Sequence, residues 1–288
     1  MSSTSQYTDF SDLYLGLQHR VRVTTGVSAT TEQAKQYINT ALHDFNLGFQ
    51  YKLPWLERQG QLRTHAPYST GTVAISVGSA TLTGTDSLWN TANSYGEANA
   101  RTTGKLVFEG TTDIYPITTV TSDTAIALTN KYVGSAALSG ATYTYFEDTY
   151  DLASDFLRPM DFQFFSQARN IQLIPRDEFR RRFPRPNVAG NPEYACLLDL
   201  APTGSTSHIR RVQFYPYPST TLIIPYTYVT NAVGVSSAGS ALTSLSSDTD
   251  EPLIPLRYRH AIVYHALYHW YRDKRDDARS QEAKAEYT

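Results

Sequence analysis

The chain has 288 residues, of which 41% are hydrophobic, and it carries a formal net charge of −2 and a single cysteine. This length and composition place it among globular proteins of one or two domains, and the lone Cys196 excludes an internal disulfide and is expected to be a packed thiol. The N-terminus has no charged-then-apolar leader and no apolar run is long enough to span a bilayer, so we expect a soluble protein made inside the cell.

The N-terminal region has the spacing of two helices. Apolar residues fall at i, i+3, i+4 and i+7 from Phe10, and Asp9 or Ser11 is available as the N-cap. A longer apolar face covers 34–45 and is expected to end at Gly48. These helices belong to the host domain of the predicted fold.

Residues 68–150 differ from both flanks, because their apolar residues alternate with a period of two between Gly, Ser, Asn and Asp turns. With three basic and seven acidic side chains the stretch has a net charge of −4. We predict a small antiparallel barrel or sandwich inserted into the host domain, which would comprise 1–67 and 151–288. Its strands are expected at residues 72–77, 80–84, 105–108, 115–120, 125–129 and 142–146.

The segment after this module is expected to form a small antiparallel sheet of the host, with strands at 156–165, 171–174, 212–215 and 222–229. Residues 158–211 hold nine arginines against five acids, and the run from Arg180 to Arg185 concentrates them. Arginine forks bind phosphates and carboxylates. A solvated, salt-bridged loop or a protein–protein contact is favoured over nucleic-acid binding, because the pI of the chain is only about 6.4.

The C-terminal third combines a polar stretch and a helical pattern. Residues 230–250 are small and polar, which predicts a mobile loop or linker. From Pro255 the apolar pattern is helical, and it is followed from Asp273 by alternating charges. A helix over 256–286 would span about 45 Å, too long to be buried in a domain of this size, so its charged half is expected in water or against another protein. The predicted fold class is therefore α+β, a helical host with a long C-terminal helix, a small antiparallel sheet and an inserted all-β module.

Candidate chemistry is sparse. His265 and His269 have the i, i+4 spacing that can hold a divalent metal, but no Glu follows His265 and the third ligand would be His260, which lies well round the helix. Packing or capping histidines are favoured, and neither metal nor cofactor is expected. The carboxylates at 147–148, with Asp151 and Asp155, could be a glycosidase pair, yet a solvated turn is the favoured interpretation. Nucleophile elbows, phosphate loops and dinucleotide motifs are absent from the sequence, so no enzyme is predicted.

In this order of parts the chain resembles the head-to-tail adaptor (connector) proteins of tailed bacteriophages. Two stretches carry the resemblance. Residues 68–89, 115–128 and 143–145 look like a β module recurrent in phage virion proteins, and 253–279 look like the closing helix of the adaptor family.

The resemblance implies a structural protein of the virion, made in the bacterial cytoplasm, that forms a homo-oligomeric ring of twelve copies under the portal vertex. Its partners would be the portal protein, tail, nozzle or tail-tube proteins, further copies of itself, and genomic DNA passing through the channel without sequence-specific binding; no membrane is involved. By analogy, residues 273–288 are assigned to portal docking. The predicted docking contacts are Arg272, Lys274, Arg275 and Tyr287, and the predicted ring or tail contacts are Arg180, Arg181, Arg182, Arg185, Tyr264 and Tyr271.

Two alternatives remain. In the first, the chain is a tail-fibre or host-glycan-binding protein whose β module stacks sugars on Trp89 and Tyr95. The second, weaker one is a metal-dependent hydrolase built on His265 and His269.

Overall fold

The computed structural model describes residues 7–22, 28–48, 53–164, 169–198 and 209–287. They form an α+β protein, as predicted, that divides into two compact units. We call Met1–Arg58, Asp155–Arg158 and Tyr228–Thr288 the helical unit, and Gln59–Ser154 and Pro159–Thr227 the sheet unit. None of the helices in the described residues combines the length and the apolar character that a bilayer crossing needs.

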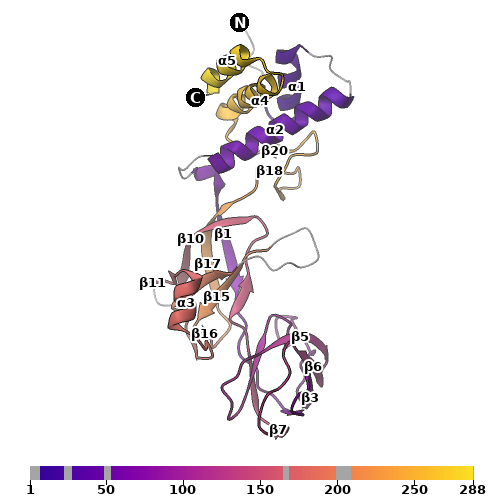
Figure 1. Cartoon of the computed structure of the whole chain (residues 1–288), viewed down its shortest axis with the longest axis vertical. Helices are drawn as coiled ribbons and strands as arrows, with labels where there is room; N and C mark the ends of the chain where they lie inside the picture. Colours follow the sequence, from indigo (N-terminus) through magenta and orange to yellow (C-terminus); the bar gives the residue numbers. More distant parts are fainter. Residues whose placement is uncertain (1–6, 23–27, 49–52, 165–168, 199–208, 288) are drawn as a thin grey trace. The chain divides into compact units, whose positions relative to one another are not determined.

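The helical unit is built on the two predicted N-terminal helices and the C-terminal helical segment (Figure 1). Asp9 caps the first helix by accepting a 3.0 Å hydrogen bond from the backbone N–H of Asp12. The apolar faces of the helices meet in one core, because residues three and four apart lie on the same side of a helix. The helices are α1 (Phe10–Val21), α2 (Ser28–Gly48), α4 (Arg259–Asp273) and α5 (Asp277–Tyr287), and the 3-10 turns η1 (Pro54–Leu56) and η3 (Leu256–Tyr258) flank them.

The C-terminal segment is a pair of helices. A long helix is present as α4, but the expectation that it continues unbroken to residue 286 is wrong. Arg275 has a left-handed backbone with φ of 60°, which ends α4, and the Asp276 carboxylate accepts a hydrogen bond from the backbone N–H of Arg279 in the first turn of α5. Ser280 and Ala283 of α5 are buried, so this charged segment packs on its own chain through its small residues.

The predicted linker at 230–250 is ordered, which corrects the sequence interpretation. It contributes to a three-stranded sheet of β18 (Gly234–Val235), β19 (Ala241–Leu242) and β20 (Glu251–Pro252). Val233 and Leu245 are buried in the core of the helical unit. The Asn39 side-chain amide makes two hydrogen bonds with the backbone of Leu245. Its Oδ1 accepts from the Leu245 N–H at 2.8 Å, and its Nδ2 donates to the Leu245 carbonyl at 3.0 Å. Two buried side chains and this amide fix a stretch whose composition alone is typical of a loop.

The sheet unit contains a seven-stranded antiparallel sheet with its own core, which curls on itself in Figure 1. All six strands predicted between residues 72 and 146 are present, because alternate apolar residues such as Val73 and Ile75 turn to one buried face. One further strand, β7, lies in a Gly- and Ser-containing stretch without that alternation. In spatial order the strands are β7 (Leu138–Ala141), β2 (Thr72–Ile75), β3 (Thr81–Thr85), β6 (Ala125–Leu128), β5 (Tyr115–Ser122), β4 (Lys105–Phe108) and β8 (Tyr143–Phe146).

Two four-stranded sheets and a strand pair make up the rest of the β structure in the described residues. One has the order β1 (Glu57–Arg63), β17 (Ile223–Thr230), β10 (Phe156–Phe164) and β11 (Arg169–Asn170). The other, which we call the β15 sheet, has the order β12 (Gln172–Leu173), β14 (Tyr194–Leu198), β15 (Arg211–Tyr215) and β9 (Thr149–Asp151). The strand pair is β13 (Ala189–Gly190) with β16 (Tyr217–Pro218), and both this pair and β12–β14 are parallel.

The arginine run expected in a loop lies partly in a short helix, α3 (Arg176–Arg182). Asp177 and Glu178 are in its first turn and three arginines in its last, the arrangement that the helix dipole favours. Phe179 is buried with Ile174 and Cys196, which attaches the helix to the β15 sheet.

Glu147 and Asp148 are buried and paired, so the expected solvated turn is wrong. Arg101 binds the Glu147 carboxylate through Nε and Nη2, both at 2.8 Å, and Lys105 Nζ lies 2.6 Å from Asp148. Gln213 of β15 donates to the same Asp148 oxygen at 2.6 Å. These carboxylates therefore join the seven-stranded sheet to the β15 sheet at the point where the chain passes from β8 to β9.

Candidate functional site

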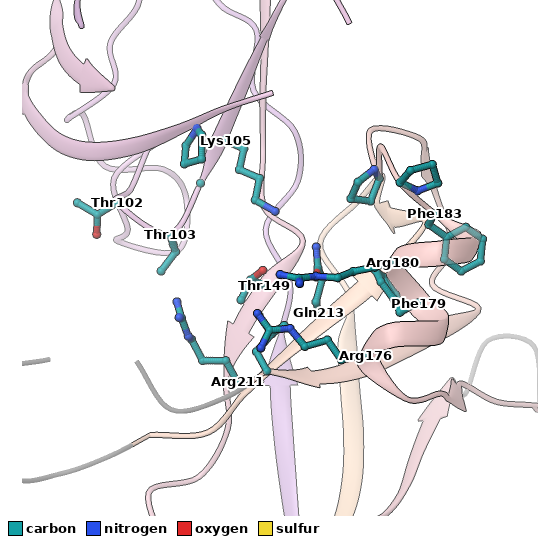
Figure 2. Close-up of a pocket in the computed structure, with 15 residues that line it drawn as sticks. Thr102, Thr103, Lys105, Thr149, Arg176, Phe179, Arg180, Phe183, Arg211 and Gln213 are labelled. Atoms are coloured by element: carbon teal, nitrogen blue, oxygen red, sulfur yellow. The ribbon is translucent and has the colours of Figure 1, made fainter. Parts of the chain in front are cut away.

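A basic cavity of about 630 Å³ lies in the sheet unit, and four cationic side chains line it (Figure 2). One wall is the segment from Thr102 to Lys105, next to the seven-stranded sheet. The other is formed by α3 and by the β15 sheet. No acidic side chain is among the described residues that line it. The four cations are Lys105, Arg176, Arg180 and Arg211.

Local structure explains why the arginines converge. Arg176 and Arg180 are four residues apart on α3, so they leave the same face of the helix. Arg211 and Gln213 are two residues apart on β15 and so share one face of the strand. Figure 2 shows the three guanidinium groups reaching toward one space, with Lys105 entering from the opposite wall.

The electrostatics of the cavity favour an anion. The charge of Lys105 is balanced by the buried Asp148, whereas the Nε of Arg211 is buried without a hydrogen-bond partner among the described residues. A buried donor left unpaired costs about 1–3 kcal/mol. A carboxylate or phosphate placed between the guanidinium groups would satisfy it, since both anions match the fork of an arginine.

The remaining arginines of the predicted ring or tail contacts have separate surroundings. Arg182 forms an ion pair with Glu178 one turn earlier on α3, and Arg185 donates to the Thr112 hydroxyl at 2.6 Å. Arg181 is exposed and does not line the cavity. Arg180 is therefore the member of the predicted run that the structure brings to the basic cavity.

Three of the predicted portal contacts cluster at the turn between α4 and α5. Arg272 is exposed and lies 5.3 Å from the centre of the Tyr268 ring. Lys274 caps α4, with its ammonium 5.7 Å from the Trp270 ring, and Arg275 occupies the left-handed position of the turn. Tyr287 ends α5, and its side chain lies outside the part of the chain that is described.

Tyr264 and Tyr271 both contact arginines of the helical unit. Arg20 stacks over the Tyr264 ring at 4.5 Å and donates to its hydroxyl at 3.1 Å. Arg279 of α5 lies 5.7 Å from the centre of the Tyr271 ring. Both tyrosines line a hollow of about 520 Å³ between α4, α5 and the end of α1, so part of each ring is covered by its own chain.

A second cluster of polar side chains joins α2 to α4. Asp44 Oδ2 lies 3.0 Å from His265 Nε2 and 2.8 Å from His269 Nε2, and the two Nε2 atoms are 3.2 Å apart. Burial lowers the pKa of His265, against the opposing effect of its hydrogen bond to Asp44. This is the group among the described residues whose atoms could hold a metal ion together. His260, the ligand that sequence spacing offered, is exposed and is not part of it.

Trp89 cannot serve as an exposed sugar platform. It is fully buried in the core of the seven-stranded sheet and donates from its indole N–H to the Tyr143 hydroxyl at 2.9 Å. Tyr95 is about half exposed, and Arg63 lies 4.8 Å from the centre of its ring. The pair of stacking aromatics on which the glycan-binding alternative depended is therefore not formed.

Sequence reasoning missed Arg176, Arg211, Lys105 and Asp44. A helical interpretation of 176–182 would have placed Arg176 beside Arg180, because the acidic first turn and basic last turn are a helix signal. Arg211 and Lys105 reach the cavity only through pairing of strands distant in the sequence, for which no local pattern exists.

Comparison with known proteins gives one family. Residues 118–288 match the sequence model of a family described as the SU10 adaptor protein. The match begins within β5 and includes α3, the β15 sheet and the pair of C-terminal helices. No curated protein matches the chain.

Proposed function

Because the chain belongs to the SU10 adaptor protein family, a family of phage adaptor proteins, we propose that it forms the ring joining the portal vertex of a bacteriophage head to the tail. In this role it is a structural component of the virion, extends the DNA channel and presents the surface on which tail proteins assemble. The family match over 118–288 carries the proposal. It agrees with the resemblance seen in the sequence.

A ring subunit needs two complementary lateral faces and separate axial contacts. The chain offers surfaces of different character in its two units, an arginine-lined cavity in the sheet unit and an exposed basic turn in the helical unit. We assign the body of the subunit to residues 1–67 and 151–288, and treat 68–150 as an inserted module. Twelve copies per ring is the stoichiometry that the family resemblance implies.

Portal docking is assigned to the turn between α4 and α5, with Arg272, Lys274 and Arg275 as contacts and Tyr287 at the end of the second helix. Removing all of 273–288 is a poor test, because it would also remove the buried Ser280 and take Ala283 out of the helical core. Lys274→Glu is sharper, since the side chain is exposed. Lys131→Glu makes the same charge change on an exposed lysine of the sheet unit and is the matched control.

The basic cavity, with the arginine run beside it, is assigned to the ring or tail contacts. Its chemistry suits acidic side chains of a neighbouring virion protein, because carboxylates match guanidinium forks. Arg180→Glu changes a cavity-lining residue, whereas Arg181→Glu changes its exposed neighbour on the same helix. Weaker assembly with the first and not the second would assign the contact to the cavity.

The deciding experiment is electron microscopy with mass determination of the purified chain, alone and mixed with portal-containing, tailless heads. We expect a ring on the portal vertex for the wild type and for Lys131→Glu. Lys274→Glu should slow docking about tenfold at low ionic strength, since charges at an interface rim mainly set the association rate. A chain that stays monomeric and ignores portal-containing heads would refute the adaptor assignment, and equal docking of the two lysine variants would refute the assigned docking turn alone.

A further inference from the structure

We propose that Asp44, His265 and His269 form a binding site for a first-row divalent cation of the zinc type, which fastens α2 to α4. The site lies within the helical unit and goes beyond the proposed portal and tail contacts, although Arg272, one of the proposed docking residues, borders it. It uses one helix for both histidines and another for the carboxylate.

The spacing of the three ligand atoms is that of metal ligands. Zinc binds imidazole nitrogen and carboxylate oxygen at about 2.0–2.2 Å, and tetrahedral geometry then puts the ligand atoms about 3.3 Å apart. The three separations among the two Nε2 atoms and Asp44 Oδ2 are 2.8, 3.0 and 3.2 Å. A small outward shift of the exposed carboxylate would bring all three to ligand spacing.

The ligand rings are held in place before any ion arrives. His265 packs against the Phe45 ring at 5.2 Å and stacks with Tyr268 at 5.9 Å, and the His265 and His269 side chains are only 13% and 8% exposed. The Asp44 side chain is 49% exposed, which provides an entry path and leaves a fourth coordination position open to water. Three protein ligands with one open position is a common zinc arrangement.

Hydrogen bonds close the cluster, with both Nε2 atoms at the same carboxylate oxygen. Arg272 completes it by donating to Nδ1 of His269 at 3.1 Å. Ligation through Nε2 would put the proton of His269 on Nδ1, where it needs an acceptor, and a guanidinium offers none. The exposed Arg272 must therefore move aside when the ion binds, and its charge opposes the ion.

Because Arg272 opposes the ion, one substitution should weaken metal binding and another should strengthen it. In tag-free full-length protein, Co²⁺ should give the strong visible absorption of tetrahedral coordination, saturating at one ion per chain and removed by added Zn²⁺. Asp44→Asn keeps a hydrogen-bond acceptor but removes the charged ligand, and should abolish the absorption. Arg272→Gln supplies an acceptor for Nδ1 and removes a charge, and should tighten binding about tenfold.

His260→Gln is the matched control, because it removes an exposed histidine of the same helix outside the cluster and should leave the titration unchanged. Circular dichroism would check that each variant is folded. The proposal is overturned if the wild type gives no saturable absorption, if Asp44→Asn binds as the wild type does, or if His260→Gln loses the signal.

Discussion

Buried charges are held differently in the two units. In the sheet unit, the Glu147 and Asp148 carboxylates are bound by cationic side chains, Arg101 and Lys105. In the helical unit, the buried Arg259 donates to the backbone carbonyls of Ile254 and Pro252, and the buried Asp250 accepts from the backbone N–H groups of two serines. The sheet unit pairs its buried carboxylates with cationic side chains, whereas the helical unit holds its buried charges mainly through backbone groups of turns, with a longer ion pair of 3.6 Å from Arg259 to the exposed Glu251.

This difference separates structural charges from candidate sites. Removal of one member of a buried ion pair leaves an uncompensated charge, so such pairs are part of the fold. The polar groups that we assign to function have another character, because they reach solvent. The arginines line the basic cavity, where Lys105 belongs both to the cavity and to the buried pair with Asp148, and the Asp44–His265–His269 cluster is reached through the 49% exposed Asp44 side chain.

The largest expected effect comes from breaking the ion pair of the sheet unit. Asp148→Asn removes the charge that faces the 20% exposed Lys105 and should lower the free energy of unfolding by about 3 kcal/mol. Hydrogen exchange measured by mass spectrometry should show faster exchange in peptides from 68–152 and unchanged exchange in α4 and α5. Asp151→Asn, an exposed acid of β9, is the control and should change stability by less than about 0.5 kcal/mol. Equal effects of the two variants would mean that the buried ion pair of the sheet unit is not part of what stabilises the fold.

A smaller effect tests how the helical unit ends. Arg275 adopts a left-handed backbone, which costs a non-glycine residue about 1 kcal/mol, so Arg275→Gly should stabilise the protein by up to that amount. Lys274→Gly, at a right-handed position next to it, should be destabilising. Thermal and urea unfolding of both variants would measure the difference. If α4 and α5 were one continuous helix, both substitutions would destabilise it by similar amounts.

The sequence predicted those elements whose buried face repeats along the chain, and it did not predict contacts between residues far apart. Strands such as β2 and β4 and the helix α1 were predictable, because a buried face imposes a period of two or 3.6 on consecutive residues. The break at Arg275 was not, since that residue has no propensity for a left-handed turn and the flanking charges suit a helix. Nor was the pairing of Asp148 with Lys105, 43 residues away, because composition marks an acidic dipeptide as solvated unless its partners are known.

The sequence did not predict the full set of residues at either of the two proposed sites. His265 and His269 were found by their spacing, but Asp44 is 221 residues from His265 in the sequence. The arginine run was found by composition, whereas the cavity also needs Arg211 from a strand beyond it. Local patterns therefore supplied some of the residues, and the tertiary fold selected which of them meet.

The last prediction changes no residue and concerns Cys196, which reports on the packing beneath the basic cavity. Its side chain is fully buried and packs with Ile174 and with Phe179, which belongs to α3. Burial raises the pKa of the thiol to about 11. At pH 8 only about one thiol in a thousand would be ionised, so the native protein should react with a disulfide reagent far more slowly than the urea-unfolded chain. Rapid labelling of native protein would mean that α3 separates readily from the β15 sheet. In that case Arg176 and Arg180 would not be held where the cavity needs them, and the sheet unit would lose its candidate site while its buried ion pairs stayed intact.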